Sequence, residues 1–377
     1  MKRFSCNDNE VFFENTVCLA TEEKLGFIPE VLDLCAITPA TDKLYRTQHR
    51  KLGDRRFRKC ANYQHQQVCN WMVAEADPEP FCLACRLNKV IPDLSKPENR
   101  TYWREIEQNK RRLIYTLLAL GLPLVDRNQD PEFGLAFAFL ADATQPAEFY
   151  DESAGGNPIM TGHNRGLITI NIAEADPRYR EQMRMNMNES YRTLIGHFRH
   201  EVGHYYWYRL IFNNYCHAEF VQLFGDETID YQNTLQQYYT NGPAFNWWES
   251  FISAYASSHP WEDWAECWAH YLHIIDTLET AQNSRLLGAG SLLGSVVRRD
   301  RPLPASMLEL PIKAILDTWV DLSIAMNNIN RSIGLGDFYP FVISPRVMKK
   351  LEFIHRIVSE QRSANATAST VLPIETG

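Results

Sequence analysis

The pattern of apolar and polar positions divides the chain near residue 95. Up to that point the sequence is rich in Cys, Pro and turn residues and shows little helical periodicity. From TYWREIEQNKRRLIYTLLALGL, residues 101–122, apolar residues recur at the three- and four-residue spacing of amphipathic helices. The pattern therefore predicts a small irregular module over residues 1–95 and a mainly helical domain over residues 96–360.

Two segments depart from the helical pattern. GLITINIAEAD, residues 166–176, carries alternating β-branched residues after its glycine and predicts a strand. SANATASTVLPIETG, residues 363–377, is small and polar and offers little apolar surface to order it, so we expect a flexible tail over residues 361–377. Helices with one small sheet make the expected fold class α+β.

Composition and charge exclude some classes of protein. The chain has 45% hydrophobic and 22% charged residues, as ordinary globular proteins do. A formal net charge of −8 argues against a protein that mainly coats nucleic acid or an anionic membrane. The longest apolar run, residues 113–125, is too short to cross a bilayer, so we expect no membrane segment. The first ten residues, MKRFSCNDNE, are polar where a secretory signal is apolar, and we expect a cytoplasmic protein.

Cysteines provide a first candidate metal site. The chain has nine, most of them in its first part, and in a reducing compartment such a cluster favours metal ligands over disulfides. Cys60, Cys69, Cys82 and Cys85 supply four thiolates, enough to close one tetrahedral zinc site. The last two have the tight spacing of a zinc knuckle, whereas the gap between the first two is longer. We expect a structural zinc that holds residues 1–95 together.

A second candidate site lies in HEVGH, residues 200–204. On a helix, His200 and His204 lie on one face, so both imidazoles can bind one ion while Glu201 lies beside it. A zinc hydrolase needs this arrangement, because the adjacent carboxylate takes a proton from water at the metal. Two histidines that are hydrogen-bonded inside an apolar helix are the alternative, and a five-residue motif alone does not decide between them.

A catalytic zinc also needs a third protein ligand and an open position. Residues 259–281 predict a helix that begins at Pro260 and carries Glu262 and Glu266 one turn apart. We assign Glu262 as the third ligand and Glu266 as the acceptor of a hydrogen bond from the far nitrogen of a metal-bound histidine. The reverse assignment stays open. A surface helix whose acids only stabilise its N-terminus is the structural alternative.

Longer segments around these residues resemble a family of bacterial zinc-binding metallopeptidases. In this family, an N-terminal zinc-ribbon-like domain precedes a peptidase-like domain. The resemblance covers nearly the whole chain and is most specific in HFRHEVGHYYW and WEDWAECWAHYLH. It implies a zincin-like fold of the gluzincin type, in which the third zinc ligand is a glutamate on a later helix, and it implies zinc-dependent hydrolysis of peptide bonds.

The same resemblance implies further site residues. Some gluzincins place a tyrosine about two turns before the ligand glutamate, where its hydroxyl stabilises an oxyanion, and Tyr255 lies at that offset. A buried aromatic side chain is the equal alternative for Tyr255. The strand ITINI, residues 168–172, is then expected to be the edge strand that pairs with an extended peptide substrate.

The resemblance also indicates a degenerate first metal site in the ribbon-like domain. Relatives carry another pair of cysteine knuckles near the start. Here Cys6 is followed three residues later by Asn9, and Cys18 by Thr21. We therefore expect a metal-free remnant in which Cys6 and Cys18 lie close together, and two zinc ions per chain, one catalytic and one structural.

Two functions follow from these observations. The first is a zinc-dependent hydrolase of peptide bonds that acts on a peptide or protein, with His200, His204 and Glu262 as ligands and Glu201 as general base. The alternative is a non-catalytic scaffold whose ribbon recognises another protein or a nucleic acid. The acidic composition argues against nucleic acid, and a protein partner is one candidate for the ribbon.

Overall fold

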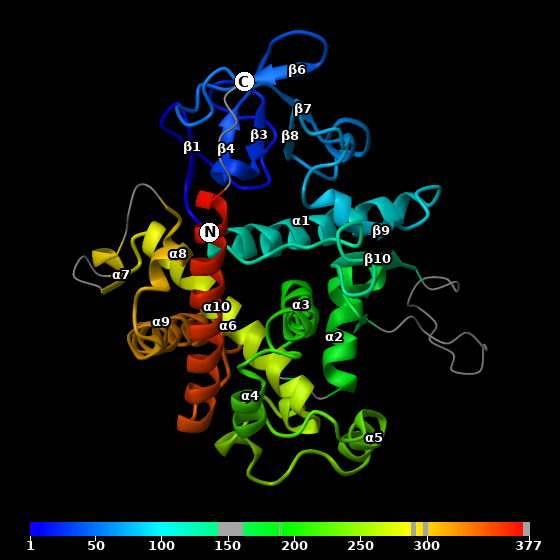
Figure 1. Cartoon of the computed structure of the whole chain (residues 1–377), viewed down its shortest axis with the longest axis vertical. Helices are drawn as coiled ribbons and strands as arrows, with labels where there is room; N and C mark the ends of the chain where they lie inside the picture. The colour runs from blue at the N-terminus through cyan, green and yellow to red at the C-terminus, as the bar shows by residue number, and fades with distance from the viewer. Residues whose placement is uncertain (142–160, 188, 190, 288–291, 297–300, 372–377) are drawn as a thin grey trace. The chain divides into compact units, whose positions relative to one another are not determined.

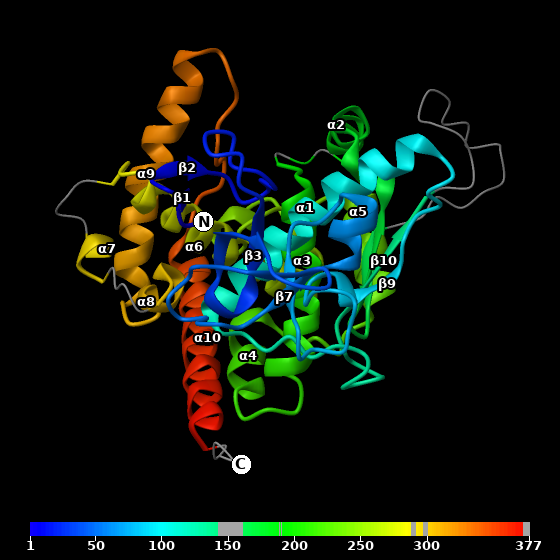
Figure 2. The same cartoon turned by 90° about the horizontal axis from the view of Figure 1, so that it is seen from above.

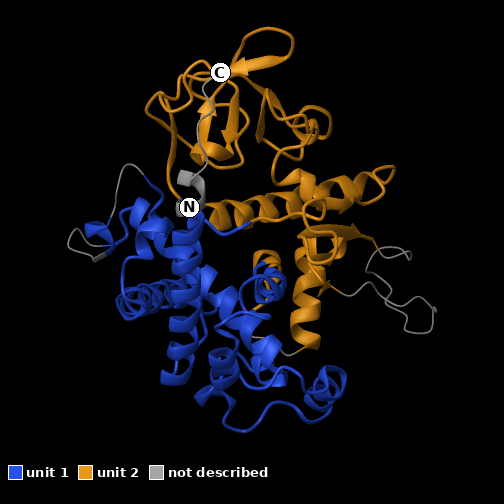
Figure 3. Ribbon diagram, viewed as in Figure 1, with its two compact units in different colours: residues 1, 119–123, 199–377 blue, residues 2–118, 124–198 orange. Residues whose placement is uncertain are grey.

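The computed structural model describes residues 1–141, 161–187, 189, 191–287, 292–296 and 301–371. The chain forms two compact units (Figure 3). Unit 2 comprises residues 2–118 and 124–198, and unit 1 comprises residue 1, residues 119–123 and residues 199–377. The expected α+β class is confirmed, since a Cys-rich region of small sheets precedes a mainly helical region.

The first part of unit 2 consists of short antiparallel strands. β1 pairs with β2, β3 pairs with β4, and the other four strands form a sheet in the order β5-β6-β7-β8. Asn7 and Asp8 join β1 to β2 with φ values of 47° and 63°, the left-handed backbone of a tight hairpin turn. The strands are β1 (Phe4–Cys6), β2 (Asn9–Val11), β3 (Leu25–Ile28), β4 (Asp33–Ala36), β5 (Thr38–Pro39), β6 (Leu44–Arg46), β7 (Phe57–Lys59) and β8 (Met72–Ala74).

Helix α1 (Pro97–Leu120) shares a core with these strands. The ring of Tyr115, on α1, lies 5.7 Å from that of Phe13 and 6.2 Å from that of Phe27. Phe27 in turn lies 4.6 Å from Trp71, and all four side chains are buried. Packed aromatic rings of this size dominate the burial energy of a small module, so residues 97–118 belong to the same folded unit as the strands.

A mixed sheet completes unit 2, together with helix α2 (Pro177–Asn186). Its strand order is β11-β12-β10-β9, with β9 (Asn88–Val90), β10 (Ala136–Leu140), β11 (Gly162–Asn164) and β12 (Leu167–Asn171). The strand predicted over residues 166–176 is confirmed for Leu167–Asn171, which form β12, whereas Ile172–Ala175 form a short 3-10 helix. The expectation that it is an edge strand is wrong, because β12 lies between β10 and β11.

The turn between β11 and β12 explains this correction. Arg165 and Gly166 have φ values of 44° and 84°, so the chain reverses tightly and β11 pairs with β12. The Nε2 atom of His163 accepts a hydrogen bond from the backbone N–H of Gly166 at 2.8 Å, which stabilises the turn. Among the described strands of this sheet, the short β11 therefore occupies the edge beside β12.

Unit 1 is helical. Its helices are α3 (Leu194–Leu210, of which residues 199–210 belong to this unit), α4 (His217–Phe224), α5 (Tyr231–Asn241), α6 (Pro260–Asn283), α7 (Leu292–Ser295), α8 (Leu303–Met307), α9 (Ile312–Ser332) and α10 (Pro345–Val371). α6 packs against α4, α8, α9 and α10, the last of which is the long red helix of Figures 1 and 2. α6 begins at Pro260, as predicted, and the His259 side chain accepts a hydrogen bond from the backbone N–H of Trp261.

Two further observations concern the sequence predictions. α10 includes residues 361–371 of the expected flexible tail, while residues 372–377 lie outside the described part of the chain. Within the residues that the structure describes, no helix combines the length and the apolar character needed to cross a membrane.

Candidate metal centres

The candidate catalytic centre depends on a close approach of α3 and α6. Gly203, inside the HEVGH motif, has no side chain to separate the helices, and a Cβ atom there would lie 3.0 Å from the Cα atom of Ala265. The indole N–H of Trp264 donates a hydrogen bond of 2.8 Å to the backbone oxygen of Gly203. The small residue and this hydrogen bond hold the motif directly against the first turns of α6.

This packing brings three of the predicted ligands together. One donor atom from each of His200, His204 and Glu262 lies within 4.8 Å of the other two. Nε2 of His200 lies 3.0 Å from Glu262 Oε2, and Nε2 of His204 lies 3.6 Å from Glu262 Oε1. Two imidazole nitrogens and one carboxylate are the donor set of many catalytic zinc sites.

Glu266 contacts the opposite nitrogen of His200. Its Oε1 atom lies 2.8 Å from Nδ1 of His200, and its Oε2 atom accepts a hydrogen bond of 2.6 Å from the hydroxyl of Ser253. A hydrogen bond at Nδ1 leaves Nε2 of His200 directed toward Glu262. The arrangement matches a metal-binding histidine and its supporting carboxylate, with Glu262 rather than Glu266 in the three-donor group.

The charges of the histidines and glutamates at this site shift one another's pKa values. Although burial alone would have the opposite effect, His204 and His200 hold the pKa of Glu262 well below its usual value. Burial likewise acts against the protonation of His200, yet Glu262 and Glu266 raise its pKa well above the usual range. A carboxylate that is 1% exposed thus keeps its negative charge inside the fold because cationic or metal-binding partners surround it.

The residues fit a bound cation. Glu262 Oε2 is buried and accepts no hydrogen bond from the described residues, although it lies 3.0 Å from Nε2 of His200. Buried carboxylate oxygens are normally paired, and a metal ion shared by the imidazoles and this carboxylate would satisfy it.

Glu201 and Tyr255 lie beside the three-donor group. Glu201 is 8% exposed, and burial raises the pKa of its carboxyl group above the usual value. The ring of Tyr255 lies 6.0 Å from that of His200, and burial raises the pKa of its phenol well above the usual range. Tyr255 therefore keeps its proton and can serve as a hydrogen-bond donor.

The sequence analysis did not predict two residues that contact the site. The hydroxyl of Tyr231, at the start of α5, donates a hydrogen bond of 2.8 Å to Oε1 of Glu262. Ser253 supports Glu266, as described above. Both come from segments outside α3 and α6, so no helical spacing connects them to the motif.

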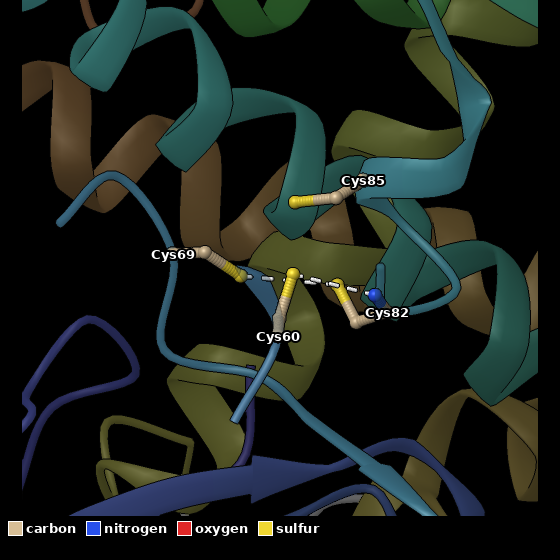
Figure 4. A group of neighbouring side chains, drawn as sticks. All are labelled: Cys60, Cys69, Cys82 and Cys85. Carbon is tan, nitrogen blue, oxygen red and sulfur yellow. Dashed lines mark hydrogen bonds between the residues drawn. The ribbon is translucent and has the colours of Figure 1, made fainter. Parts of the chain in front are cut away.

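The four predicted cysteines form a second centre, in unit 2. Figure 4 shows the side chains of Cys60, Cys69, Cys82 and Cys85 converging, and their sulfur atoms all lie within 4.8 Å of one another. All four are buried and none is in a disulfide. Backbone N–H groups of Cys82 and Trp71 donate to the sulfurs of Cys60 and Cys69, each at 3.3 Å. Four buried thiols with N–H donors fit a tetrahedral zinc site.

Helix α1 adds a cation to this centre. Arg111 is 3% exposed, and its guanidinium donates a hydrogen bond to the backbone oxygen of Val68. Burial alone would lower the pKa of Arg111, but Cys69, Glu107 and the other nearby thiols raise it. Glu107 itself is paired at 2.9 Å with Lys110. Four thiolates around a divalent ion carry two negative charges, which would compensate the buried charge of Arg111.

The first pair of cysteines has different neighbours. The thiol of Cys6 donates to Glu23 Oε2 at 3.3 Å and lies 3.8 Å from the hydroxyl of Thr21. Burial and Glu23 raise the pKa of Cys6 to about 11. The thiols of Cys6 and Cys18 interact with each other, so the two residues are close together as expected. That this region holds no metal stays a prediction.

Comparisons with known proteins identify the families whose models match the chain. Residues 99–357 match a family described as "Putative zinc-binding metallo-peptidase", and residues 3–96 match a family described as "zinc-ribbon domain". Uncharacterized proteins of Mycobacterium bovis and of two strains of Mycobacterium tuberculosis are 39% identical over 363 residues, which cover 96% of this chain and 96% of each relative. No solved structure matches the chain significantly.

Proposed function

Because the chain belongs to the family described as putative zinc-binding metallo-peptidases, we propose that it hydrolyses peptide bonds with a zinc ion held by His200, His204 and Glu262. One observation carries the proposal. The donor atoms of these three residues lie within 4.8 Å of one another, and Glu266 is placed to orient His200 from its far side.

Zinc, when bound there, lowers the pKa of a coordinated water and polarises a carbonyl group. Glu201 is the general base in this proposal. It follows His200 directly on α3, and its raised pKa makes its carboxylate a better proton acceptor at neutral pH than an exposed glutamate. Glu201 accepts a proton from the attacking water and delivers it to the leaving amine.

In this proposal, three neighbouring side chains assist the hydrolysis. Tyr255, which keeps its phenolic proton, donates a hydrogen bond to the oxyanion that forms at the attacked carbonyl. Tyr231 fixes the carboxylate of Glu262 through its hydroxyl. Glu266 holds the ring of His200 so that Nε2 is directed at the metal position.

The four-cysteine centre has a structural role in this proposal. A zinc ion bound by Cys60, Cys69, Cys82 and Cys85 has no open position for a substrate, so it holds the surrounding strands together. The chain then carries two zinc ions, one catalytic and one structural. The ribbon region is also the place where a protein partner would bind if the chain acted as a scaffold.

A cleavage experiment tests the proposal. The full chain, purified without chelator, is incubated with a mixture of unmodified peptides, and products are identified by mass spectrometry. Cleavage that stops when zinc is removed by a chelator and returns when zinc is restored supports the proposal. Bound zinc at the histidine centre without cleavage of any peptide would favour the scaffold.

A further inference from the structure

A cavity of about 400 Å³ lies in unit 1 between α5 and the segment that leads into α6. Tyr238 and Asn241 line it from α5, and Ser258 and His259 line it just before α6 begins. Its volume is within the range of about 300–1,000 Å³ that is usual for ligand pockets in proteins.

The lining of the cavity is neutral. None of the described residues around it is Asp, Glu, Lys or Arg. Burial lowers the pKa of His259, so its imidazole is uncharged at neutral pH. The remaining surface combines aromatic rings with the amides of Gln237 and Asn241. Such a cavity would exclude a charged side chain, which it could not pair, and accept a large uncharged one.

The ammonium group of Lys350 lies near the cavity but does not offer it a free positive charge. Lys350 lies 5.5 Å from the ring of Phe224 and 4.5 Å from the ring of Phe251, the two phenylalanines of the cavity wall. Its ammonium group is already paired with the carboxylate of Asp263 and donates to the backbone oxygen of Ser250. The charge of Lys350 is therefore compensated within the protein and is not available to a ligand.

Ser258, one of the residues that line the cavity, carries a buried polar group without a partner in the described part of the chain. It is 7% exposed, and its Oγ atom has no hydrogen-bond partner among the described residues. A buried hydroxyl without a partner has lost the hydrogen bonds that it would make in water. A hydroxyl or amide group of a bound ligand would satisfy it.

Aromatic side chains lie between the cavity and the candidate metal ligands. The ring of Tyr238, which lines it, lies 5.9 Å from that of Tyr255, and Tyr255 lies 6.0 Å from His200. On a second route, the ring of Tyr231 lies 5.0 Å from His259, while its hydroxyl donates to Glu262. One layer of aromatic side chains thus separates the cavity from the three-donor group.

From these observations we propose that the cavity is a substrate subsite that binds a large, uncharged side chain of the peptide, with tyrosine preferred. Aromatic walls bind the ring of that side chain, and Ser258 Oγ hydrogen-bonds to its hydroxyl. The inference rests on the proposed peptidase function, because it assigns the cavity to that substrate.

Cleavage profiling of the zinc-loaded full chain with a degenerate peptide mixture tests the subsite. One position at a fixed distance from the cleaved bond should be enriched in Tyr and Phe and depleted in Asp, Glu, Lys and Arg. Gln237→Glu should shift this position toward Lys and Arg, because it adds a carboxylate to the wall. Gln236→Glu is the matched control, since Gln236 is the neighbouring residue on α5 and does not line the cavity. An unchanged profile with Gln237→Glu would overturn the inference while cleavage itself upheld the peptidase function.

Ser258→Ala tests the predicted hydrogen bond. The ratio of tyrosine to phenylalanine cleavage should fall about threefold to tenfold, the effect of one neutral hydrogen bond. If the ratio of tyrosine to phenylalanine cleavage is the same in wild type and variant, Ser258 does not hydrogen-bond to the substrate hydroxyl.

A binding measurement separates this inference from hydrolysis. N-acetyl-tyrosinamide and N-acetyl-lysinamide are added to the full chain, and binding at the cavity is followed by crystallography and by titration calorimetry. Tyrosinamide binding that Gln237→Glu weakens, without any peptide cleavage, would support the subsite and contradict the peptidase. Equal binding of both amides, or binding of neither, would overturn the subsite whatever the cleavage result.

Discussion

Oε1 of Glu266 lies 2.8 Å from Nδ1 of His200, on the side of the ring opposite to Glu262. One histidine therefore connects the two glutamates that lie one turn apart on α6. The contact gives each glutamate a different task, because only Glu262 shares the space to which both histidine Nε2 atoms point.

The first prediction follows from that difference. Glu262→Ala removes one of the three proposed protein ligands, so zinc retention at the histidine centre should be lost. Glu266→Ala should weaken zinc binding by about 10–100-fold, as loss of an orienting carboxylate typically does. Elemental analysis and competition with a chromophoric chelator measure both effects. If Glu266→Ala abolished zinc retention and Glu262→Ala only weakened it, the roles of the two residues would be exchanged.

Tyr231 provides a second prediction. Tyr231→Phe removes the hydrogen bond to Glu262 but keeps the ring, so zinc affinity at the histidine centre should fall about threefold to tenfold while the melting temperature changes little. Tyr239→Phe is the control, because that ring is exposed on the same helix. Equal affinities of the two variants would show that Tyr231 does not position Glu262.

Gly203 is predicted to control the packing of the motif. In Gly203→Val, the new side chain would meet Ala265 and Trp268, so unfolding free energy should fall by about 1–3 kcal/mol. Gly336→Ala, at a position with open space around it, should be nearly neutral. Denaturant unfolding of both variants checks this. Full stability of Gly203→Val would mean that α3 and α6 do not pack as closely as described.

These findings separate what local sequence determines from what it does not. The pairing of His200 with His204 follows from helical spacing, and Glu262 follows from the resemblance together with the start of α6 at Pro260. Tyr231 could not be found this way, because it reaches Glu262 from α5 through tertiary packing alone. The position of β12 was predicted wrongly because three residues, Gly162–Asn164, form a strand too short to show periodicity.

At the cysteine centre, the position of Arg111 likewise could not be predicted from local sequence. The segment NKRR, residues 109–112, contains two adjacent arginines that the sequence does not distinguish, yet Arg111 is buried beside the thiols. Arg112, the next residue, is partly exposed and pairs with Glu14. Only the packing of α1 on the strands distinguishes the two arginines.

This pair gives a fourth prediction. Arg111→Met should weaken zinc binding at the cysteine centre at least tenfold, because the thiolate cluster loses its buried counter-charge. Arg112→Met should have little effect, since exposed ion pairs contribute about 0–1 kcal/mol. Release of zinc to a chelator from the full chain distinguishes the variants. Similar release from both would contradict a role for Arg111 in charge compensation.

Removing each metal should have different consequences for the fold. The double variant Cys82→Ser with Cys85→Ser should loosen the strands of residues 1–95 and α1, because the proposed structural zinc and the aromatic core hold them as one unit. His204→Ala should leave most of the fold intact. Hydrogen exchange measured by mass spectrometry locates the loosened segments. If His204→Ala unfolded the chain and the cysteine variant did not, the structural and catalytic roles would be inverted.

Peptide hydrolysis by Glu201→Gln, measured at a zinc occupancy equal to that of the wild type, shows whether Glu201 is the general base of a zinc-dependent peptidase. Glutamine has nearly the same shape as glutamate but cannot accept the proton of the attacking water. We predict that zinc stays bound and that the cleavage rate falls by about 10²–10⁴-fold, the usual contribution of a general base. A Glu201→Gln variant that retains both its zinc and the wild-type rate would contradict this prediction.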